Sequence, residues 1–212
     1  MYAAALLSDE ADLAYTSATD VAAAIRARQV SPVEAVQAAA RRIEDRDPTL
    51  NAFVFLAIDE ALEQARAAER TLMSGQAIGP LHGVPTAMKD LFDFKPGWPS
   101  TFGGVPALQR FTPDFSCSWV ERMEAAGAIV LGKTNSPVFG FSGVCDNQLF
   151  GPTGNPFAPA RNSGGRPAGR PPPSRTGWCR SPRRPTAAGP PGSPRRGAGS
   201  SGSSSRWAGF RW

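Results

Sequence analysis

The stretch that decides the fold runs from residue 79 to residue 95 and reads GPLHGVPTAMKDLFDFK. A Gly-Pro turn opens it, and the apolar run over residues 84–88 predicts a buried strand. Lys89 ends that run, and Asp90 follows it. Because burial disfavours the charged form of lysine, a lysine set among apolar residues is a candidate general base. Lys89 is therefore the candidate catalytic residue, and the alternative is a surface lysine paired with a nearby acid.

The motif L-H-G-V-P-x-A-x-K-D around Lys89 resembles the amidase signature family of amide hydrolases. The segments 127–141 (GAIVLGKTNSPVFGF) and 151–165 (GPTGNPFAPARNSGG) agree with it, so the resemblance extends over residues 17–165. It implies an α/β fold with a mixed β-sheet flanked by helices, truncated relative to the family's usual domain. It also implies that Lys89 is the base of a Ser–cis-Ser–Lys triad acting on a small-molecule amide.

Further expectations follow from the same resemblance and from the composition. The resemblance implies neither a metal nor an organic cofactor, and the family's outer helices include dimer surfaces, so a homodimer is one expectation. The three cysteines have no metal-ligand spacing and fit a reducing compartment. The first residues lack the basic segment of a signal peptide, and no apolar stretch reaches membrane length. These features predict a cytoplasmic protein without a membrane partner.

The two parts of the chain differ sharply in charge. Residues 1–160 carry all 18 acidic residues but only 12 of the 23 basic ones, whereas residues 161–212 carry 11 arginines and no acid. The second part also contains no Leu, Ile, Val or Met. Such a segment cannot bury enough apolar surface to offset its chain entropy. We therefore predict that residues 1–165 form the N-terminal part of an amidase signature domain and that residues 166–212 form a disordered tail.

Local signals predict the elements that carry these motifs. Ser17 and Ser31 have the form of helix N-caps, and the second is followed by Pro32 and by Glu34 three residues after the cap. Asp47-Pro48 predicts the end of that second helix. The remaining expectations are helices over 58–73 and 116–127, strands over 51–56 and 128–131, and loops over 95–113 and 133–135.

Two single positions qualify the resemblance. His82 is the only histidine, but it lies in a turn and no G-x-S-x-G motif accompanies it, so we expect a structural role. The segment from Trp98 to Thr101 resembles the family's P-T-T stretch beside the substrate pocket. Val138 stands where the family usually has Glu, which weakens any transfer of substrate preference.

The family pattern breaks after residue 165. By resemblance, Gly164 and Gly165 belong to the substrate-binding turn and should be followed by the cis-serine, but Arg166 stands there. Pro190 stands where the family has its nucleophilic serine. Arginine cannot relay the proton, and proline offers neither a hydroxyl nor an N–H group. We therefore expect this chain to be catalytically incomplete.

A shift of reading frame accounts for the break. If the last base of each codon is joined to the first two bases of the next, residues 166–179 permit SSGGSAAAVADGLV and residues 186–203 permit DGGGSTRIPAAWCGVVGF. The second string has the form of the family's nucleophile turn, with its serine at position 190. The length of the consecutive match argues against coincidence. The tail is thus interpreted as an out-of-frame translation.

Two alternatives remain open at this point. The arginine-rich tail could bind nucleic acid through phosphate contacts, with stacking from its tryptophans, although it has no repeated RGG or RS unit. Within the family, the amidotransferase component that releases ammonia for tRNA-dependent amidation shares these motifs. That branch tends to have Asp where this chain has Pro137, so the sequence favours a free-standing amidase.

Overall fold

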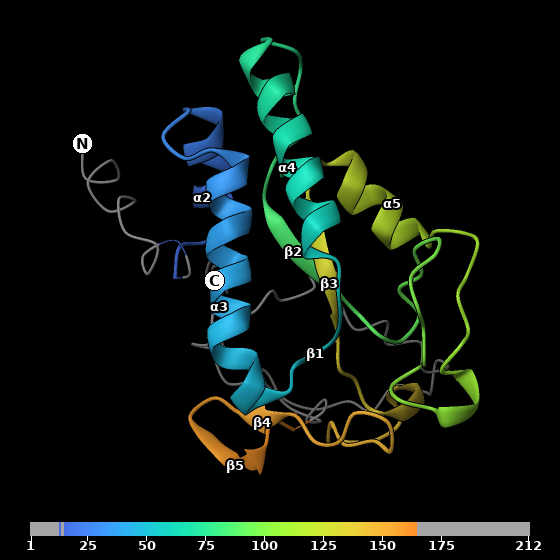
Figure 1. Ribbon diagram of the computed structural model, residues 1–212. Helices are drawn as coiled ribbons and strands as arrows, with labels where there is room; N and C mark the ends of the chain where they lie inside the picture. The colour runs from blue at the N-terminus through green and yellow to red at the C-terminus, as the bar shows by residue number, and fades with distance from the viewer. Residues whose placement is uncertain (1–12, 14, 165–212) are drawn as a thin grey trace, which may run out of the picture.

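The computed structural model describes residue 13 and residues 15–164. The principal elements, in chain order, are α2 (Ala18–Arg26), α3 (Pro32–Leu50), β1 (Phe53–Leu56), α4 (Ile58–Met73), β2 (Pro85–Lys89), α5 (Ser118–Ala125), β3 (Ile129–Thr134), β4 (Gly154–Asn155) and β5 (Ala158–Asn162). Two short 3₁₀ turns lie between them, over Pro106–Leu108 and Val138–Gly140. Figure 1 shows α3 and α4 standing side by side in front of the strands.

The main sheet is mixed, as the sequence predicts. Its strand order is β1-β3-β2, with β2 parallel and β1 antiparallel to β3. The parallel pair begins where Pro85 lies opposite Ile129 and ends where Lys89 lies opposite Thr134. Because parallel strands end at the same edge, side chains at both carboxyl ends come together there. The separate β4-β5 hairpin is antiparallel.

Helices cover both faces of this sheet, which confirms the predicted layering (Figure 1). On one face, Ala87, Ile129 and Leu131 pack against buried side chains of α3 and α4. On the other face, Met88 and Val130 pack against Val120 of α5. Neighbouring strand residues thus point to opposite layers, as the period of two requires. Strands that are buried on both faces need the nearly continuous apolar composition found over residues 84–88 and 128–131.

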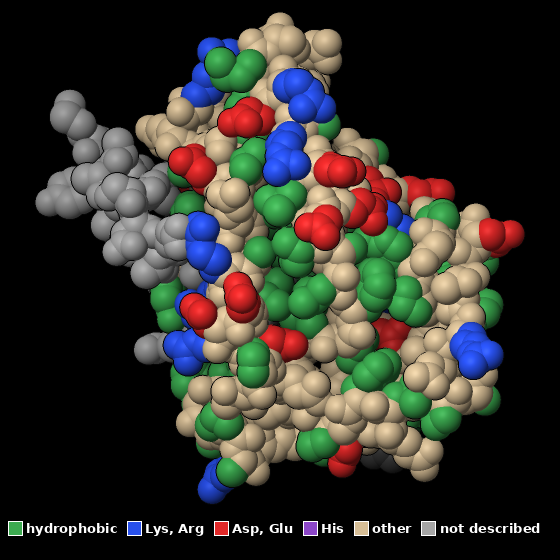
Figure 2. Space-filling view, viewed as in Figure 1, with side chains coloured by type: hydrophobic (Ala, Val, Ile, Leu, Met, Phe, Trp, Pro, Cys, Tyr) green, Lys and Arg blue, Asp and Glu red, His purple; other side chains and the backbone are tan. Residues whose placement is uncertain are grey.

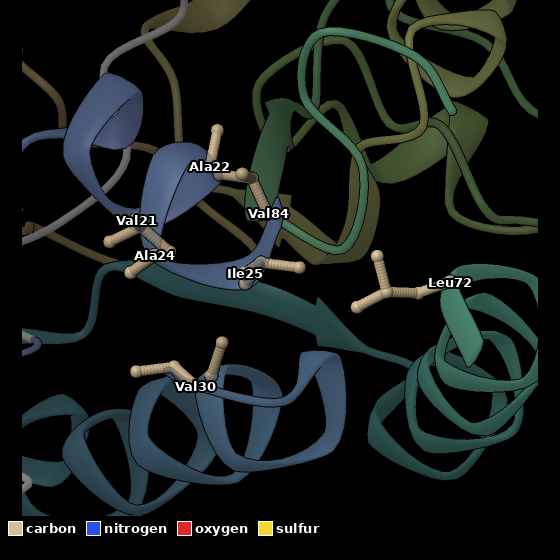
Figure 3. Close-up of a cluster of buried hydrophobic side chains, with 8 residues drawn as sticks. Val21, Ala22, Ala24, Ile25, Val30, Leu72 and Val84 are labelled. Atoms are coloured by element: carbon tan, nitrogen blue, oxygen red, sulfur yellow. The ribbon is translucent and has the colours of Figure 1, made fainter. Parts of the chain in front are cut away.

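The α2 helix closes a second part of the core. Figure 3 shows its buried side chains directed at the turn before α3, the end of α4 and the start of β2; the labelled residues are Val21, Ala22, Ala24, Ile25, Val30, Leu72 and Val84. Ile25 is fully buried. Burial of one such side chain contributes about 1.5–3 kcal/mol. This cluster fixes the turn that leads into β2.

The helix starts are confirmed, and one helix end is corrected. The Ser17 side chain caps α2, and Ser31 and Glu34 form a complete capping box at α3. The prediction that Asp47-Pro48 ends α3 is wrong, because the helix continues to Leu50. Leu50 is buried, and the carboxylate of Asp47 accepts hydrogen bonds from the two backbone N–H groups that lead into β1, at 2.6 and 3.0 Å. Tertiary contacts therefore override the local preference before proline.

Aromatic rings gather on the loops beyond the carboxyl ends of the strands. Phe102 lies 5.6 Å from each of Phe92, Phe94 and Phe139, measured between ring centroids. Phe92 and Phe139 are exposed, and the nearby Phe141 is 90% exposed. Figure 2 shows further hydrophobic side chains on the surface, among the charged side chains of the helices. This much apolar surface among the described residues predicts a tendency to self-associate.

Candidate active site

Lys89 is the last residue of β2, and β2 is an edge strand of the described sheet. Its side chain is exposed. The expectation that Lys89 is itself desolvated is therefore wrong for the described residues, because the strand ends there and the apolar layers lie behind it. Its backbone is held firmly by contrast: the Lys89 N–H donates to the carboxylate of Asp93 at 3.1 Å, and the Asp90 N–H donates to the Thr134 carbonyl at 2.9 Å.

The desolvated lysine is Lys133, which lies on the neighbouring strand. Its side chain is completely buried. The ammonium donates to the Pro99 carbonyl at 2.7 Å and to the Ser100 hydroxyl, and it lies 3.6 Å from a carboxylate oxygen of Asp90. Burial lowers the pKa of Lys133, and the negative charge of Asp90 only partly offsets that effect. The sequence predicts only a loop over residues 133–135 and assigns no chemical role to Lys133 itself.

The prediction that residues 133–135 form a loop is correspondingly wrong in part. Strand β3 continues through Lys133 to Thr134 and only then ends. A lysine can occupy the buried strand because two oxygen atoms accept hydrogen bonds from its ammonium and the carboxylate of Asp90, 3.6 Å away, balances its charge. The sequence does contain a signal for this arrangement. Lys133 follows an apolar run, as Lys89 does, and Asp90, directly after Lys89, is an acid that could pair with Lys133.

Asp90 joins the strand end to the loop that resembles the family's pocket segment. One of its carboxylate oxygens accepts the Thr101 N–H at 2.8 Å, and the other accepts the Thr101 hydroxyl. The backbone carbonyl of Asp90 accepts the Ser136 hydroxyl at 2.8 Å. Asp90, Ser136 and Thr101 are all buried. The residue after Lys89 is thus anchored through both its side chain and its backbone.

Ser100 and Lys133 form a serine–lysine contact, which is a pairing found in some hydrolases. Both residues are 0% exposed, so a substrate carbonyl cannot reach the hydroxyl. The Lys133 ammonium is moreover surrounded by acceptors that stabilise its proton. This pair therefore serves the scaffold, whereas the amine of Lys89 is exposed among the described residues.

A second charged cluster supports the loop from the opposite side. The Lys95 ammonium lies 2.9 Å from a carboxylate oxygen of Glu60 on α4 and 2.9 Å from one of Glu124 on α5. It also lies 4.6 Å from the ring centroid of Trp98, whose indole N–H donates to Glu60 at 3.0 Å. Partial burial alone would lower the pKa of Lys95, but the hydrogen bonds and charges of the two glutamates raise it above its ordinary value.

The segment that carries the predicted substrate-binding glycines is tied to the same end of the sheet. Asn135, directly after β3, donates to the Gly151 carbonyl at 3.1 Å and to the Thr153 hydroxyl at 3.0 Å. Gly164 adopts a positive φ of 73° and donates its N–H to the Asn162 side chain at 3.0 Å. Asn162 in turn bonds the backbone of Cys145.

Cys145 links this segment electrostatically to Lys89. Burial raises the pKa of the Cys145 thiol, while a hydrogen bond from Thr153 and the positive charge of Lys89 act in the opposite direction. The charge of Lys89 thus acts on the Cys145 thiol, and Cys145 is bonded through Asn162 to the segment that ends in Gly164. Gly165, the other predicted substrate-binding residue, lies outside the described residues, as do Arg166 and Pro190, which stand at the expected positions of the two serines.

His82 has the surroundings of a scaffold residue. Its Nε2 lies 2.9 Å from the Ala68 carbonyl of α4. It borders a hollow of about 370 Å³ between α4 and α5, next to Gln64, Glu124 and Ile129. Ile129 begins β3, whereas Lys89 lies opposite its end, so the hollow and the candidate site are at opposite ends of the strands.

Within residues 15–164, no group of three or more His, Cys, Asp or Glu side chains is arranged to hold a metal ion. Over the same part of the chain, none of the helices combines the length and the apolar character needed to span a bilayer.

Comparisons with known proteins give one consistent family. The sequence profile of the family described as Amidase matches residues 34–170. The A subunit of a glutamyl-tRNA(Gln) amidotransferase from Acidothermus cellulolyticus is 39% identical over 158 residues, covering 74% of this chain and 31% of its own length. An indoleacetamide hydrolase from Bradyrhizobium diazoefficiens is 42% identical over 153 residues, covering 72% of this chain and 29% of its own.

Solved structures agree with the sequence comparison. A bacterial aryl acylamidase of the amidase signature family is 47% identical, with a TM-score of 0.68, over 71% of this chain and 31% of its own. A fatty acid amide hydrolase is 29% identical with a TM-score of 0.70, over 76% of this chain and 28% of its own. The chain therefore spans about a third of the length of the relatives it matches.

Proposed function

Because the chain belongs to the Amidase family, we propose that the protein in complete form hydrolyses carbon–nitrogen amide bonds of small-molecule substrates, with Lys89 as the catalytic base. The observation that carries this proposal is the position of Lys89: an exposed amine at the carboxyl end of β2, on a backbone held by Asp93 and Thr134. Ligand sites of open α/β sheets lie at this edge.

The proposed mechanism uses a Ser–cis-Ser–Lys relay. The nucleophilic serine attacks the amide carbonyl while its proton passes through the cis-serine to the Nζ of Lys89, which acts as the base. Backbone N–H groups beside the nucleophile stabilise the oxyanion. The tetrahedral intermediate expels ammonia or an amine, which receives the proton, and leaves an acyl-enzyme. Water then attacks the ester, loses a proton to the relay and releases the carboxylic acid.

This chain is proposed to lack that activity as it stands. Arg166 and Pro190 occupy the positions of the two serines, and residues 166–212 are interpreted as an out-of-frame translation. The proposal is a free-standing amidase in the cytoplasm, which can form a homodimer, and Pro137 favours this branch over the amidotransferase branch. The indoleacetamide hydrolase and the amidotransferase relative are similar to the chain at comparable identity, so the identities do not separate the two branches and the proposed preference rests on Pro137.

The first experiment is to resequence the coding DNA across codons 160–212 and beyond. Recovery of one missing or inserted base, followed by a long open frame through G-G-S, supports the proposal. A gene that encodes Arg166-Pro167 with no such frame contradicts the out-of-frame interpretation. The 212-residue chain is then assayed on a panel of anilides and primary amides, and we expect no turnover and no labelling by a serine-directed phosphonate.

The role of Lys89 is tested in the gene whose frame is restored at codon 166. Replacing Lys89 by Ala should abolish amide hydrolysis, whereas the matched variant Lys95→Ala should retain it. Retention of kcat/KM within about tenfold in the Lys89 variant would show that the assigned role is wrong, since loss of a general base costs at least about a hundredfold.

The arginine-rich tail supports one alternative function. Eleven arginines without an acidic residue over 161–212 form a segment that nucleic acid would attract by counterion release. Under this alternative, the 212-residue chain binds DNA or RNA at low salt and loses affinity steeply as salt rises. A chain ending at residue 165 serves as the control, because it lacks nearly all of those arginines. Equal binding by both would exclude the tail as the binding segment.

A further inference from the structure

The structure assigns a positioning role to two buried residues beside the proposed base. We propose that Lys133 and Asp90 fix the end of β2, and thereby the direction in which the Lys89 amine projects. This inference rests on the proposed function of Lys89, because a positioned amine matters only if it takes part in the reaction. Neither residue reaches the substrate itself, since both are buried.

The register of β2 and β3 places Lys89 next to both residues. Lys89 lies opposite Thr134, and Met88 lies opposite Lys133. Asp90 follows Lys89 directly, and its N–H donates to the Thr134 carbonyl at 2.9 Å. The Thr134 hydroxyl donates back to the Met88 carbonyl at 3.3 Å. The two strand ends are thus joined on both sides of the Lys89 backbone.

The second step is the connection to the loop. Lys133 binds the Pro99 carbonyl and the Ser100 hydroxyl, and Asp90 accepts both hydrogen-bonding groups of Thr101. The ion pair between Lys133 and Asp90, at 3.6 Å, therefore joins residues 99–101 to the end of β2. Asp93 closes the arrangement because its carboxylate accepts the N–H of Lys89 at 3.1 Å. The Lys133, Asp90 and Asp93 side chains are buried, so water does not replace a lost partner.

The buried ion pair between Lys133 and Asp90 carries an energetic cost. A buried ammonium carries a desolvation penalty, and apolar residues of similar volume often stabilise a core as well as an ion pair does. Stability alone therefore does not explain a buried ion pair at the carboxyl ends of β2 and β3. It does supply fixed hydrogen-bond geometry at a strand end where β2 has only one neighbouring strand among the described residues. The role of the pair is therefore to hold the Lys89 backbone in one position.

The test measures amide hydrogen exchange in the 212-residue chain, site by site, without any catalytic readout. In Lys133→Met, which keeps an apolar side chain of similar length, we expect the amides of Lys89, Asp90 and Thr101 to exchange at least about tenfold faster. The matched control is Lys95→Met, which removes a different paired lysine from the same loop. Once its own loss of global stability, measured from urea unfolding, is subtracted, this control should leave exchange at Lys89 and Asp90 within about threefold of the parent chain.

A second variant separates positioning from stability. Asp90→Asn combined with Lys133→Met removes both charges, so no unpaired charge stays buried and the fold is retained even if the single variant unfolds. Under a positioning role, the double variant regains the parent exchange rates in α3, α4 and β3 but keeps fast exchange at Lys89 and at residue 90. Recovery of slow exchange at those two sites as well would overturn the proposal.

The outcome is independent of the proposed function. Unchanged exchange at Lys89 in both variants overturns the positioning role whatever Lys89 does. Faster exchange there supports it, and the Lys89→Ala assay in the restored gene then decides separately whether the positioned amine is the base.

Discussion

Replacing Lys95 by Met should destabilise the fold measurably, because this lysine joins three parts of the structure. Its ammonium contacts Glu60 on α4 and Glu124 on α5 at 2.9 Å each and lies 4.6 Å from the Trp98 ring centroid. Methionine keeps most of the apolar stem, so the change removes the charge with little loss of packing. The variant therefore measures how much the charged contacts of Lys95 contribute to the free energy of unfolding.

The expected loss follows from the exposure of the partners. The Lys95 side chain is 11% exposed, but those of Glu60 and Glu124 are 43% and 36% exposed, so solvent screens each pair. Partly exposed ion pairs contribute up to about 1 kcal/mol each, and the cation–π contact adds about 0.5–1 kcal/mol. We therefore expect a decrease of about 1–3 kcal/mol in the free energy of unfolding. The decrease should shrink in 1 M NaCl, where the Debye length falls to about 3 Å.

Urea denaturation followed by circular dichroism measures this difference without adding ionic denaturant. The matched control is Lys89→Met, because Lys89 is exposed at a strand end and its replacement should change stability by no more than about 0.5 kcal/mol. Equal losses in the two variants, or a loss in the Lys95 variant that salt leaves unchanged, would refute the assignment of the stabilisation to this cluster.

Three further predictions concern pH, capping and the exposed aromatic surface. Because the pKa of Lys95 is raised in the folded protein, the lysine should contribute fully to the free energy of unfolding below the ordinary lysine pKa of about 10.4. This contribution should disappear as pH rises through the pKa of Lys95 in the folded protein, so the unfolding midpoints of the parent and of Lys95→Met should converge there. Ser31→Ala should cost about 1 kcal/mol in urea unfolding through loss of the capping box, and Ser163→Ala, outside any helix, should not. Phe141→Ser should raise the concentration at which the chain precipitates while leaving the unfolding midpoint nearly unchanged, since that side chain is 90% exposed; equal precipitation of both chains would contradict this.

The parts of the fold that the sequence predicted are those that local interactions determine. The capping box at Ser31 forms within four residues, so the sequence alone locates the start of α3. Apolar runs located β2 and the first residues of β3 for the same reason. The mixed sheet came from the resemblance rather than from any local pattern, because strand pairing joins residues that are distant in the chain.

The errors arise where distant residues decide the outcome. Pro48 does not end α3, because Asp47 bonds the start of β1 and Leu50 is buried. Strand β3 continues past Leu131 because residues some thirty positions earlier supply acceptors for the ammonium of Lys133. No window of local sequence contains those acceptors. A charged residue after an apolar run therefore cannot be assigned to a loop until its partners are known.

The two lysines show how one local pattern produces two chemical roles. Each follows an apolar run, and the runs pair in parallel, so the ammonium groups are delivered to the same edge of the sheet. Lys133 lies on the central strand of the described sheet, where burial lowers its pKa, and its ammonium donates to Pro99 and Ser100 and forms an ion pair with Asp90. Such an amine has no free direction for a substrate. Lys89 ends the edge strand and is exposed, while the groups that satisfy Lys133 also hold the Lys89 backbone. Pairing register, rather than the sequence around either lysine, thus decides which of the two amines is buried and which is exposed among the described residues.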